Sequence, residues 1–282
     1  MQNIDVSIII VNYNTSDLTL QCLRSVYDKT VGLSFEVIVV DNASSDESVK
    51  LIESNYPHVI LVKSFENIGF GRANNLGYKY SKGNYIFLLN SDTILINNAV
   101  YLLWKFLSEN KNISIAGGQL FEKDGVSTTH SYSFLFPSIW SEIDLLFRGR
   151  ITRKIENKKQ NEIVKDGFVQ VSYITGADMM LRRDDIQQLG FFNPVFFLYF
   201  EETELSYRYY CKGRVSAFLP AAKIIHLCGS SFSLKKNRSK YYKDGRKKYF
   251  KIAHSTPHYI IANIIRLITY VTIIIEKATK FI

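Results

Sequence analysis

The chain has 282 residues, of which 46% are hydrophobic, 14% aromatic and 22% charged, with only 5 prolines. This composition excludes a disordered, collagen-like or low-complexity protein, and the length suits one large domain or a domain with an appended segment. The formal net charge is +9, concentrated in residues 148–165, with seven Lys/Arg against two acids, and residues 235–251, with nine against one. Because the remaining residues are net acidic, a uniformly basic nucleic-acid-binding protein is excluded.

The ends of the sequence and the cysteines give expectations about the compartment. Cys22, Cys211 and Cys228 are an odd number without a close pair, which argues against a disulfide framework and a Cys-x-x-Cys metal site. The first apolar segment begins at Val6 with no Lys or Arg before it. We therefore expect no secretory leader and a reducing, cytoplasmic location.

Apolar segments of strand length alternate with helical patterns in the first 120 residues. The expected strands are residues 6–11, 35–40, 59–62, 85–89 and 113–116, and the expected helices are residues 18–27, a segment ending at 55, 73–80 and 98–108. Strands that are apolar throughout and alternate with helices indicate a parallel sheet that is covered on both faces. We therefore predict an α/β fold with an open, mostly parallel sheet.

Polar side chains follow these strands, at the carboxyl ends where open α/β sheets bind ligands. The polar clusters are Asn12-Tyr13-Asn14, Asp41-Asn42, Asn67 and Asn90-Ser91-Asp92. Asp92 is well placed to hold a divalent cation against a diphosphate, although a turn-forming role explains it as well. His226 ends another apolar segment and could be a second metal ligand, but histidines without a metal are commoner.

The second half of the chain has a weaker pattern. We expect residues 121–165 to be loop-like, with strands at residues 168–174 and 215–219. Glu201, Glu202 and Glu204 crowd together after an aromatic run, at the start of a helix. Burial and mutual repulsion would raise a pKa and suit a general base, whereas the alternative is that the acids only stabilise the helix N-terminus.

Residues 67–77 are glycine-rich but do not form a dinucleotide-binding loop. Such a loop follows the first strand and opens the first helix, whereas Gly69 and Gly71 come after the third strand. We expect a flexible turn near a phosphate or base.

The C-terminal residues 258–282 have the spacing of an amphipathic helix. Its apolar positions are Ile260, Ile261, Ile264, Leu267, Ile268, Val271, Ile274 and Ile275. Arg266 would cost about 2.5–3.5 kcal/mol near a bilayer centre, so we predict an anchor in the membrane plane rather than a span. The alternative is a helix that packs on the domain's own surface.

Seven segments together resemble glycosyltransferase family 2, in particular its bacterial rhamnosyltransferase-like branch. They are VSIIIVNYN, VIVVDNASSD, ENIGFGRANNLG, YIFLLNSDT, ITGADMMLRR, GFFNPVFFLYFEETELSYR and AAKIIH, in the family's order over about residues 5–232. The resemblance implies a GT-A fold and the inverting transfer of a sugar from a nucleoside diphosphate sugar to an acceptor hydroxyl.

The resemblance also implies roles for individual residues. The donor-binding residues would be Tyr13, Asn14, Asp41, Asn67, Asn74, Asn90 and Asp92. Asp92 matches the metal-binding acid, and His226 a histidine that can complete the shell of Mg²⁺ or Mn²⁺. Asn90 stands where an acid is usual, which leaves the site one charge weaker. Glu202 matches the catalytic base of the family, and its side chain is one methylene longer than the aspartate usual at this position. Glu201 and Asp178 are the alternative candidates for the base.

These expectations divide the chain into a GT-A domain (1–234) and a membrane-association segment (235–282). Residues 1–120 would bind the nucleotide sugar, and residues 121–234 the acceptor. By resemblance, dTDP-rhamnose is the first donor to consider and a UDP-hexose the second. The acceptor would be a polyprenyl-diphosphate-linked saccharide in O-antigen or capsule synthesis, and the enzyme would lie peripherally on the cytoplasmic face of the bacterial inner membrane.

Three alternatives compete with this interpretation. A sugar nucleotidyltransferase should carry a glycine-rich, arginine-containing loop after the first strand, and VNYNTSD has neither residue. A non-catalytic saccharide- or lipid-binding protein on the same fold is motivated by Asn90 and Glu202 in place of the usual acids. Nucleic-acid binding through the basic segments is disfavoured by the adjacent amphipathic helix, so we expect no nucleic-acid partner.

Overall fold

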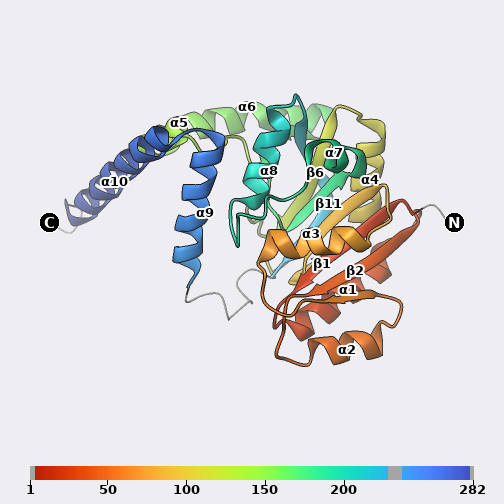
Figure 1. Cartoon of the computed structure of the whole chain (residues 1–282). Coiled ribbons are helices and arrows are strands. Elements are labelled where there is room, and N and C mark those ends of the chain that lie inside the picture. Colours follow the sequence, from red (N-terminus) through yellow and green to blue (C-terminus); the bar gives the residue numbers. More distant parts are fainter. Residues whose placement is uncertain (1–3, 228–236, 280–282) are drawn as a thin grey trace.

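The computed structural model describes residues 4–227 and 237–279, without the side chains of residues 160–164 and 275–279 (Figure 1). The strands are β1 (Val6–Asn12), β2 (Phe35–Asp41), β3 (Ile60–Lys63), β4 (Tyr85–Asn90), β5 (Thr93–Leu95), β6 (Ile113–Phe121), β7 (Tyr132–Ser133), β8 (Val169–Val171), β9 (Tyr173–Ile174), β10 (Asp178–Arg182) and β11 (Val215–His226). The helices are α1 (Ser16–Lys29), α2 (Ser48–Asn55), α3 (Phe70–Tyr80), α4 (Ala99–Glu109), α5 (Ile139–Leu146), α6 (Arg150–Asp166), α7 (Arg183–Leu189), α8 (Glu201–Tyr210), α9 (Arg238–Ala253) and α10 (Thr256–Thr279).

One sheet forms the centre of the molecule, with the order β3-β2-β1-β4-β10-β6-β11-β5 and with β8 beside β11. Strands β3, β2, β1 and β4 are parallel, as are β6 and β11, whereas β10 runs antiparallel to both of its neighbours. The predicted α/β class with a mostly parallel sheet is therefore confirmed.

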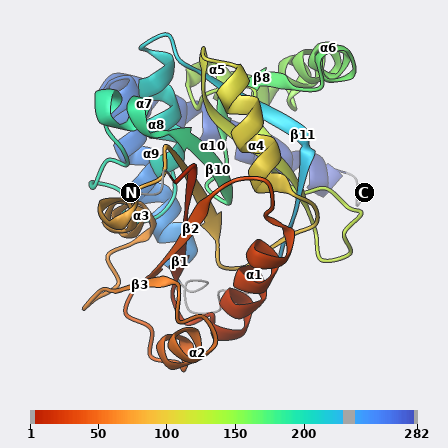
Figure 2. The ribbon, with the colours of Figure 1, turned by 90° about the vertical axis from the view of Figure 1, so that its right-hand side faces the viewer.

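Helices cover both faces of this sheet (Figure 2). Successive residues of a strand point to opposite faces, so Ile8 and Ile10 pack in one hydrophobic layer and Ile9 in the other. The first layer includes Leu23 of α1 and Leu103 of α4, while α3, α7 and α8 supply the second. Burial on both sides explains why the central residues of β1, β2 and β4 are apolar on both faces.

The structure corrects the expectation for residues 121–165, which contain α5 and α6 as well as loops. Helix α5 begins with a capping box formed by Ser138 and Ser141. The Asp144 carboxylate accepts the Ile151 and Thr152 backbone N–H groups at 2.7 and 3.0 Å and so holds the start of α6. Helix α6 has few apolar positions, which is why periodicity failed to indicate it.

Three further boundaries differ from expectation. Helix α3 starts at Phe70, so much of the glycine-rich stretch is helical rather than a flexible turn. Strand β10 was not predicted, and Asp178 is its first residue. Strand β11 runs without interruption through Pro220 to His226, with a register shift against β6 between Leu219 and Lys223.

The two C-terminal helices pack against the α/β core from one side. Helix α9 lies on α8, and α10 lies on α5 and α9 (Figure 1). Phe196 and Phe200 share a hydrophobic cluster with Tyr249 and Phe250 of α9. The boundary after residue 234 stays a prediction, but α9 and the residues that precede α8 share one core.

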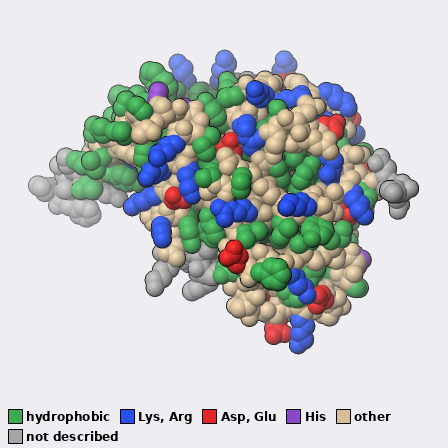
Figure 3. Space-filling view, in the orientation of Figure 1, with side chains coloured by type: hydrophobic (Ala, Val, Ile, Leu, Met, Phe, Trp, Pro, Cys, Tyr) green, Lys and Arg blue, Asp and Glu red, His purple; other side chains and the backbone are tan. Residues whose placement is uncertain are grey.

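Helix α10 presents its polar side to the protein and its apolar side outward. Asn263 accepts a hydrogen bond from Arg246, and Arg266 lies 3.7 Å from Glu142 of α5. The exposed apolar side chains are Ile260, Ile261, Ile264, Leu267, Ile268, Val271, Ile273 and Ile274. Figure 3 shows hydrophobic side chains over this end of the molecule. Residues Thr256–Ile274 are long and apolar enough to cross a membrane by length and composition.

Candidate functional site

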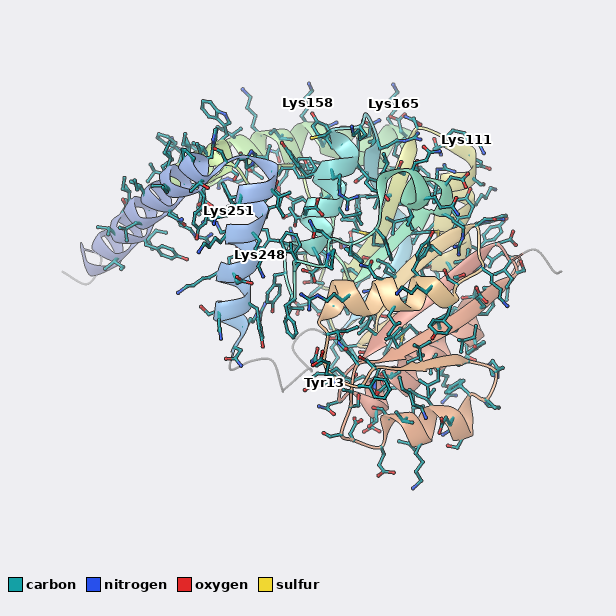
Figure 4. The ribbon with its side chains drawn as sticks, in the orientation of Figure 1. Tyr13, Lys111, Lys158, Lys165, Lys248 and Lys251 are labelled. Carbon is teal, nitrogen blue, oxygen red and sulfur yellow. The ribbon has the colours of Figure 1, made fainter. Side chains whose placement is uncertain are left out.

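A pocket opens at the carboxyl ends of β1, β2 and β4. It is lined by Val11, Tyr13, Thr15, Asn42, Asn67, Gly69, Phe70, Asn90, Ser91, Asp92, Phe197 and Leu198. Tyr13 comes from the loop after β1, at this edge of the sheet (Figure 4). The expected convergence of the polar strand ends is therefore seen in the structure.

Asp92 lines this pocket and is in contact with His226, although 133 residues lie between them in the sequence; His226 itself lines a neighbouring cavity with Glu122 and Lys123. His226 Nε2 is 3.2 Å from Asp92 Oδ1. The backbone explains the contact, because His226 pairs with Thr93 in the antiparallel β5–β11 ladder and Leu227 N–H donates to the Asp92 carbonyl at 2.8 Å. Both side chains are mostly buried, so their relative position is fixed by the sheet.

A buried network of polar side chains supports the pocket floor. Asn12 donates to Asp41 at 2.7 Å and accepts from the Thr15 and Thr19 hydroxyls at 2.9 and 2.7 Å. The Thr15 hydroxyl lies 3.0 Å from that of Ser91, next to Asp92. The network links the loops after β1, β2 and β4, so that the three strand ends keep one arrangement.

Four of the seven predicted donor-binding residues line the pocket: Tyr13, Asn67, Asn90 and Asp92. The other three are engaged within the protein. Asp41 accepts from Asn12 and from the Ser44 N–H, Asn14 accepts from the Ser45 N–H at 2.7 Å, and Asn74 donates to the Phe70 carbonyl at 3.1 Å. That these three residues contact the donor stays a prediction. In the structure, the hydrogen bonds of Asp41 and Asn14 stabilise loops, and that of Asn74 lies within helix α3.

Sequence reasoning missed several lining residues. Asn42 was noted only as part of a polar cluster, yet it donates to Asn67 at 3.0 Å and accepts from the Ile68 N–H at 2.9 Å. Gly69 has a φ of 84°, and a Cβ there would collide with the Phe197 carbonyl. This close approach brings Phe197 and Leu198 to the pocket. In the sequence, the only indication of this contact is the glycine at position 69.

Asp178, one of the three candidate bases, is enclosed in the sheet. Its Oδ2 accepts the Gly118 N–H at 2.5 Å, and Oδ1 has no hydrogen-bond partner among the described residues. Burial raises the pKa of Asp178 well above its ordinary value. A carboxyl that burial shifts toward its protonated form, and that has no access to solvent, is poorly placed to remove a proton from a substrate.

Glu201 and Glu202 begin α8 and face different surroundings. Glu201 is 2% exposed and lies against Gly71 of α3. Glu202 is half-buried and lines a second cavity, together with Tyr173 and Tyr199. Burial raises the pKa of both carboxyls, and the neighbouring charge of Glu202 raises that of Glu201 further. Of the three candidate bases, Glu202 alone lines a cavity among those found in the described residues.

The turn before α8 separates the two cavities. Phe197 and Leu198 line the first pocket, whereas Tyr199 and Phe200 line the cavity of Glu202. Tyr199 and Phe200 both have positive φ values, 70° and 72°, which are strained for aromatic residues. Glu202 therefore does not belong to the lining of the first pocket, and the strained turn lies between them.

The chemistry of the Asp92–His226 pair fits a divalent cation. A carboxylate oxygen and an imidazole nitrogen are ligands for Mn²⁺, and Mg²⁺ likewise uses few protein ligands and shares phosphate oxygens. No group of three or more His, Cys, Asp or Glu side chains in the described part of the chain is arranged to hold a metal alone. Any bound cation would therefore complete its shell with ligand oxygens or water.

Comparisons with known proteins identify the family of this chain. A family model described as glycosyl transferase family 2 matches residues 7–190. The hexosyltransferase Agl10 of low-salt glycan biosynthesis in Haloferax volcanii is 28% identical over 211 residues, which cover 72% of this chain and 61% of Agl10. The minor teichoic acid biosynthesis protein GgaB of Bacillus subtilis is 29% identical over 141 residues, 48% of this chain and 16% of GgaB. The chain thus spans less than two thirds of these curated relatives.

Solved structures share the fold. The mannosyltransferase PcManGT of Pyrobaculum calidifontis, in complex with GDP-Man and Mn²⁺, has a TM-score of 0.62 at 14% identity and covers 93% of this chain and 69% of its own. GalNAc-T7 with UDP, GalNAc and Mn²⁺ has a TM-score of 0.59 at 18% identity, over 80% of this chain and 44% of its own.

Proposed function

The chain belongs to glycosyl transferase family 2, and we propose that it is an inverting, metal-dependent glycosyltransferase that uses a nucleoside diphosphate sugar. The observation that carries this proposal is that Asp92, which lines the pocket at the ends of β1, β2 and β4, is in contact with His226. An acid backed by an imidazole, at a pocket lined by amides and aromatic rings, suits a diphosphate with a base and sugar attached.

Asp92 and His226 would hold Mg²⁺ or Mn²⁺, which when bound neutralises charge on the departing diphosphate. Tyr13, Asn42 and Asn67 offer an aromatic ring and amides to the nucleoside. The buried network beneath them keeps these groups in place before the donor arrives, which reduces reorganisation during the reaction.

As the proposed base, Glu202 takes the proton from the acceptor hydroxyl as its oxygen attacks the anomeric carbon, and the bond to the diphosphate breaks on the opposite face. Because the turn of residues 197–200 lies between Glu202 and the donor pocket, this step requires the acceptor to extend from one cavity to the other past that turn. The raised pKa supports this role, because a base that titrates nearer to neutrality accepts a proton more effectively. Phe197 and Leu198 line the donor pocket, and their apolar side chains would help to keep out water, which would otherwise hydrolyse the donor.

For the donor we propose dTDP-rhamnose first and a UDP-hexose second. The rhamnose proposal follows the resemblance of the seven segments. Relatives such as Agl10, a hexosyltransferase, and a Bacillus spizizenii poly(ribitol-phosphate) β-glucosyltransferase, 31% identical over 112 residues, support testing UDP-hexoses in parallel.

For the acceptor and location we propose a polyprenyl-diphosphate-linked saccharide of O-antigen or capsule synthesis, and peripheral attachment to the cytoplasmic face of a bacterial inner membrane. The outward apolar side of α10 and the lysines of α6 and α9 support this (Figures 3 and 4). Clustered cations are attracted to anionic lipids by about 1 kcal/mol each near the surface.

Thermal unfolding with a panel of dTDP-, UDP- and GDP-sugars, each with Mn²⁺ or EDTA, tests the donor site. A donor at 100 times its Kd should stabilise the protein by about 2.7 kcal/mol. We expect one nucleotide class to stabilise the wild type with Mn²⁺ and to lose this effect with EDTA. Stabilisation that is independent of metal would favour a non-catalytic binding protein, and no stabilisation by any donor would contradict the proposal.

A further inference from the structure

A cavity between α9 and α10 is lined by three positively charged side chains. Lys243 and Arg246 come from α9 and Arg266 comes from α10, with the tyrosines Tyr242 and Tyr270 beside them. None of the described residues that line this cavity is acidic. Cationic groups and hydroxyls around one space are the chemistry that recognises a phosphate group.

The positive charge of this cavity is only partly offset. Arg246 is 5% exposed and donates to Glu142 at 2.8 Å and to Asn263 at 2.6 Å, so its guanidinium is held rigidly. Arg266 lies 3.7 Å from the same Glu142 oxygen, with a quarter of its side chain exposed. One carboxylate thus faces two guanidinium groups, and Lys243 adds a third cation.

The position of the cavity links two other features of the molecule. Tyr242, Arg246 and Arg266 also line the cavity that contains Glu202. On the other side, Arg266 and Tyr270 belong to α10, whose apolar side faces outward. A group bound at Arg266 therefore lies between the proposed base and the apolar surface.

We propose that the cavity between α9 and α10 binds the phosphate or diphosphate group of an amphipathic ligand. Its apolar chain lies along α10, and its polar head group extends toward Glu202. This inference rests on the proposed function and deepens it, because it assigns the place where a lipid-linked acceptor is held. It also explains why α10 turns Asn263 and Arg266 inward.

Calorimetric titration of the full chain with farnesyl diphosphate, a diphosphate on an apolar chain, tests the site. We expect Lys243→Gln and Arg266→Gln to weaken binding by about 5- to 10-fold each, because each removes a charge-assisted contact. Lys251→Gln is the matched control, since Lys251 is an exposed cation of the same helix that does not line the cavity (Figure 4). Equal affinity in all three variants, or no binding to the wild type, would overturn the inference.

Two further probes identify the source of the phosphate. Inorganic pyrophosphate should bind more weakly than farnesyl diphosphate with the same dependence on Lys243, and equal affinity would contradict the role proposed for the apolar side of α10. If phosphatidylglycerol vesicles displace farnesyl diphosphate and this displacement depends on Lys243, the site binds a membrane phospholipid head group. If the vesicles do not displace farnesyl diphosphate, the site binds the diphosphate of a lipid-linked acceptor.

The failure of this inference can be told apart from failure of the proposed function. UDP and dTDP binding with Mn²⁺ is measured on the same preparations and should be unchanged in Lys243→Gln. Absence of farnesyl diphosphate binding to the wild type, with intact nucleotide binding, would overturn only the inference, whereas absence of nucleotide binding in the wild type would contradict the donor site itself.

Discussion

The adjacent residues Glu201 and Glu202 at the start of α8 have different surroundings, and this difference decides which of them can act as a base. Successive helical residues point about 100° apart, so Glu201 turns toward α3 while Glu202 faces a cavity. Both carry raised pKa values because burial disfavours the charged form. Only Glu202 has space beside it for a hydroxyl group, which makes it the better candidate base.

Replacing Glu202 with Gln should lower kcat by about 10²- to 10⁴-fold and leave donor affinity unchanged, because the amide keeps the shape and loses the base. In the wild type, activity should fall as the pH is lowered through a midpoint above the ordinary glutamate value. Steady-state rates from pH 5 to 9 check both points. Glu201→Gln serves as the control, and an unchanged rate in Glu202→Gln would reassign the base.

Asp178 gives a prediction about stability. Its raised pKa means that the folded protein retains a proton that the unfolded chain releases, so the carboxyl lowers stability as the pH rises above the ordinary aspartate value. Asp178→Asn, which can still accept from Gly118, should therefore gain stability relative to the wild type, by up to about 1.4 kcal/mol per pH unit. Urea unfolding at pH 5 and pH 8 measures this difference, and a difference independent of pH would refute it.

At the scale of elements, α9 holds the strained turn before α8. Gly245 lies so close to the Tyr199 carbonyl that a Cβ would collide with it. Lys248 donates to the Val195 carbonyl at 2.9 Å, and the rings of Phe197 and Tyr241 are 4.8 Å apart. Helix α9 thus fixes the segment that separates the donor pocket from Glu202.

The Gly245→Ala substitution tests this contact, because the contact determines whether the free energy of unfolding rises or falls. In an exposed helix, alanine would stabilise by up to about 1 kcal/mol, whereas overpacking against the turn should destabilise by about 1–3 kcal/mol. Urea unfolding measures the change, with Lys247→Ala as an exposed control on the same helix. A stabilising Gly245→Ala would show that α9 does not press on the turn.

The strands were the elements most accessible from sequence. β1, β2 and β4 begin at the predicted residues and end one residue beyond them, because burial on both faces requires continuous apolar residues. From the residues, His226 could be named only as a possible second ligand beside Asp92, and the resemblance strengthened this pairing. Their contact itself depends on β5, a three-residue strand without a readable pattern. Similarly, the inward orientation of Arg266 depends on Glu142 in a helix that periodicity did not indicate.

At the scale of the whole molecule, the orientation of α10 argues for a partner outside the chain. A helix that served only to cover the domain would bury its apolar side, whereas here Asn263 and Arg266 face inward and the isoleucines face out. Exposed Trp140, Leu145, Phe147 and Ile151 belong to the neighbouring α5–α6 region. An apolar surface of this extent, on a helix that packs against the basic helix α9, suits a lipid interface.

Membrane binding can be tested without deleting helices that share the core. The double variant Ile264→Ser/Leu267→Ser should lower the partition coefficient for phosphatidylglycerol vesicles, measured by flotation, by about 100-fold or more. Each substitution removes roughly 1.5–3 kcal/mol of apolar transfer free energy when the side chain is fully buried in lipid, and about 1.4 kcal/mol corresponds to tenfold. Both positions are exposed in the free protein, so its folding should be little affected. Val126→Ser, an exposed apolar residue elsewhere, is the control, and flotation equal to the wild type would contradict the lipid interface.

The central claim is that the pocket around Asp92 catalyses sugar transfer. It is tested most directly by release of nucleoside diphosphate from the stabilising donor, with Mn²⁺ and an organic extract of bacterial lipid-linked saccharides, in wild type and Asp92→Ala. We predict extract-dependent release in the wild type and at least a 100-fold lower rate in the variant. Equal rates in the two proteins, or donor binding without any release, would contradict the account.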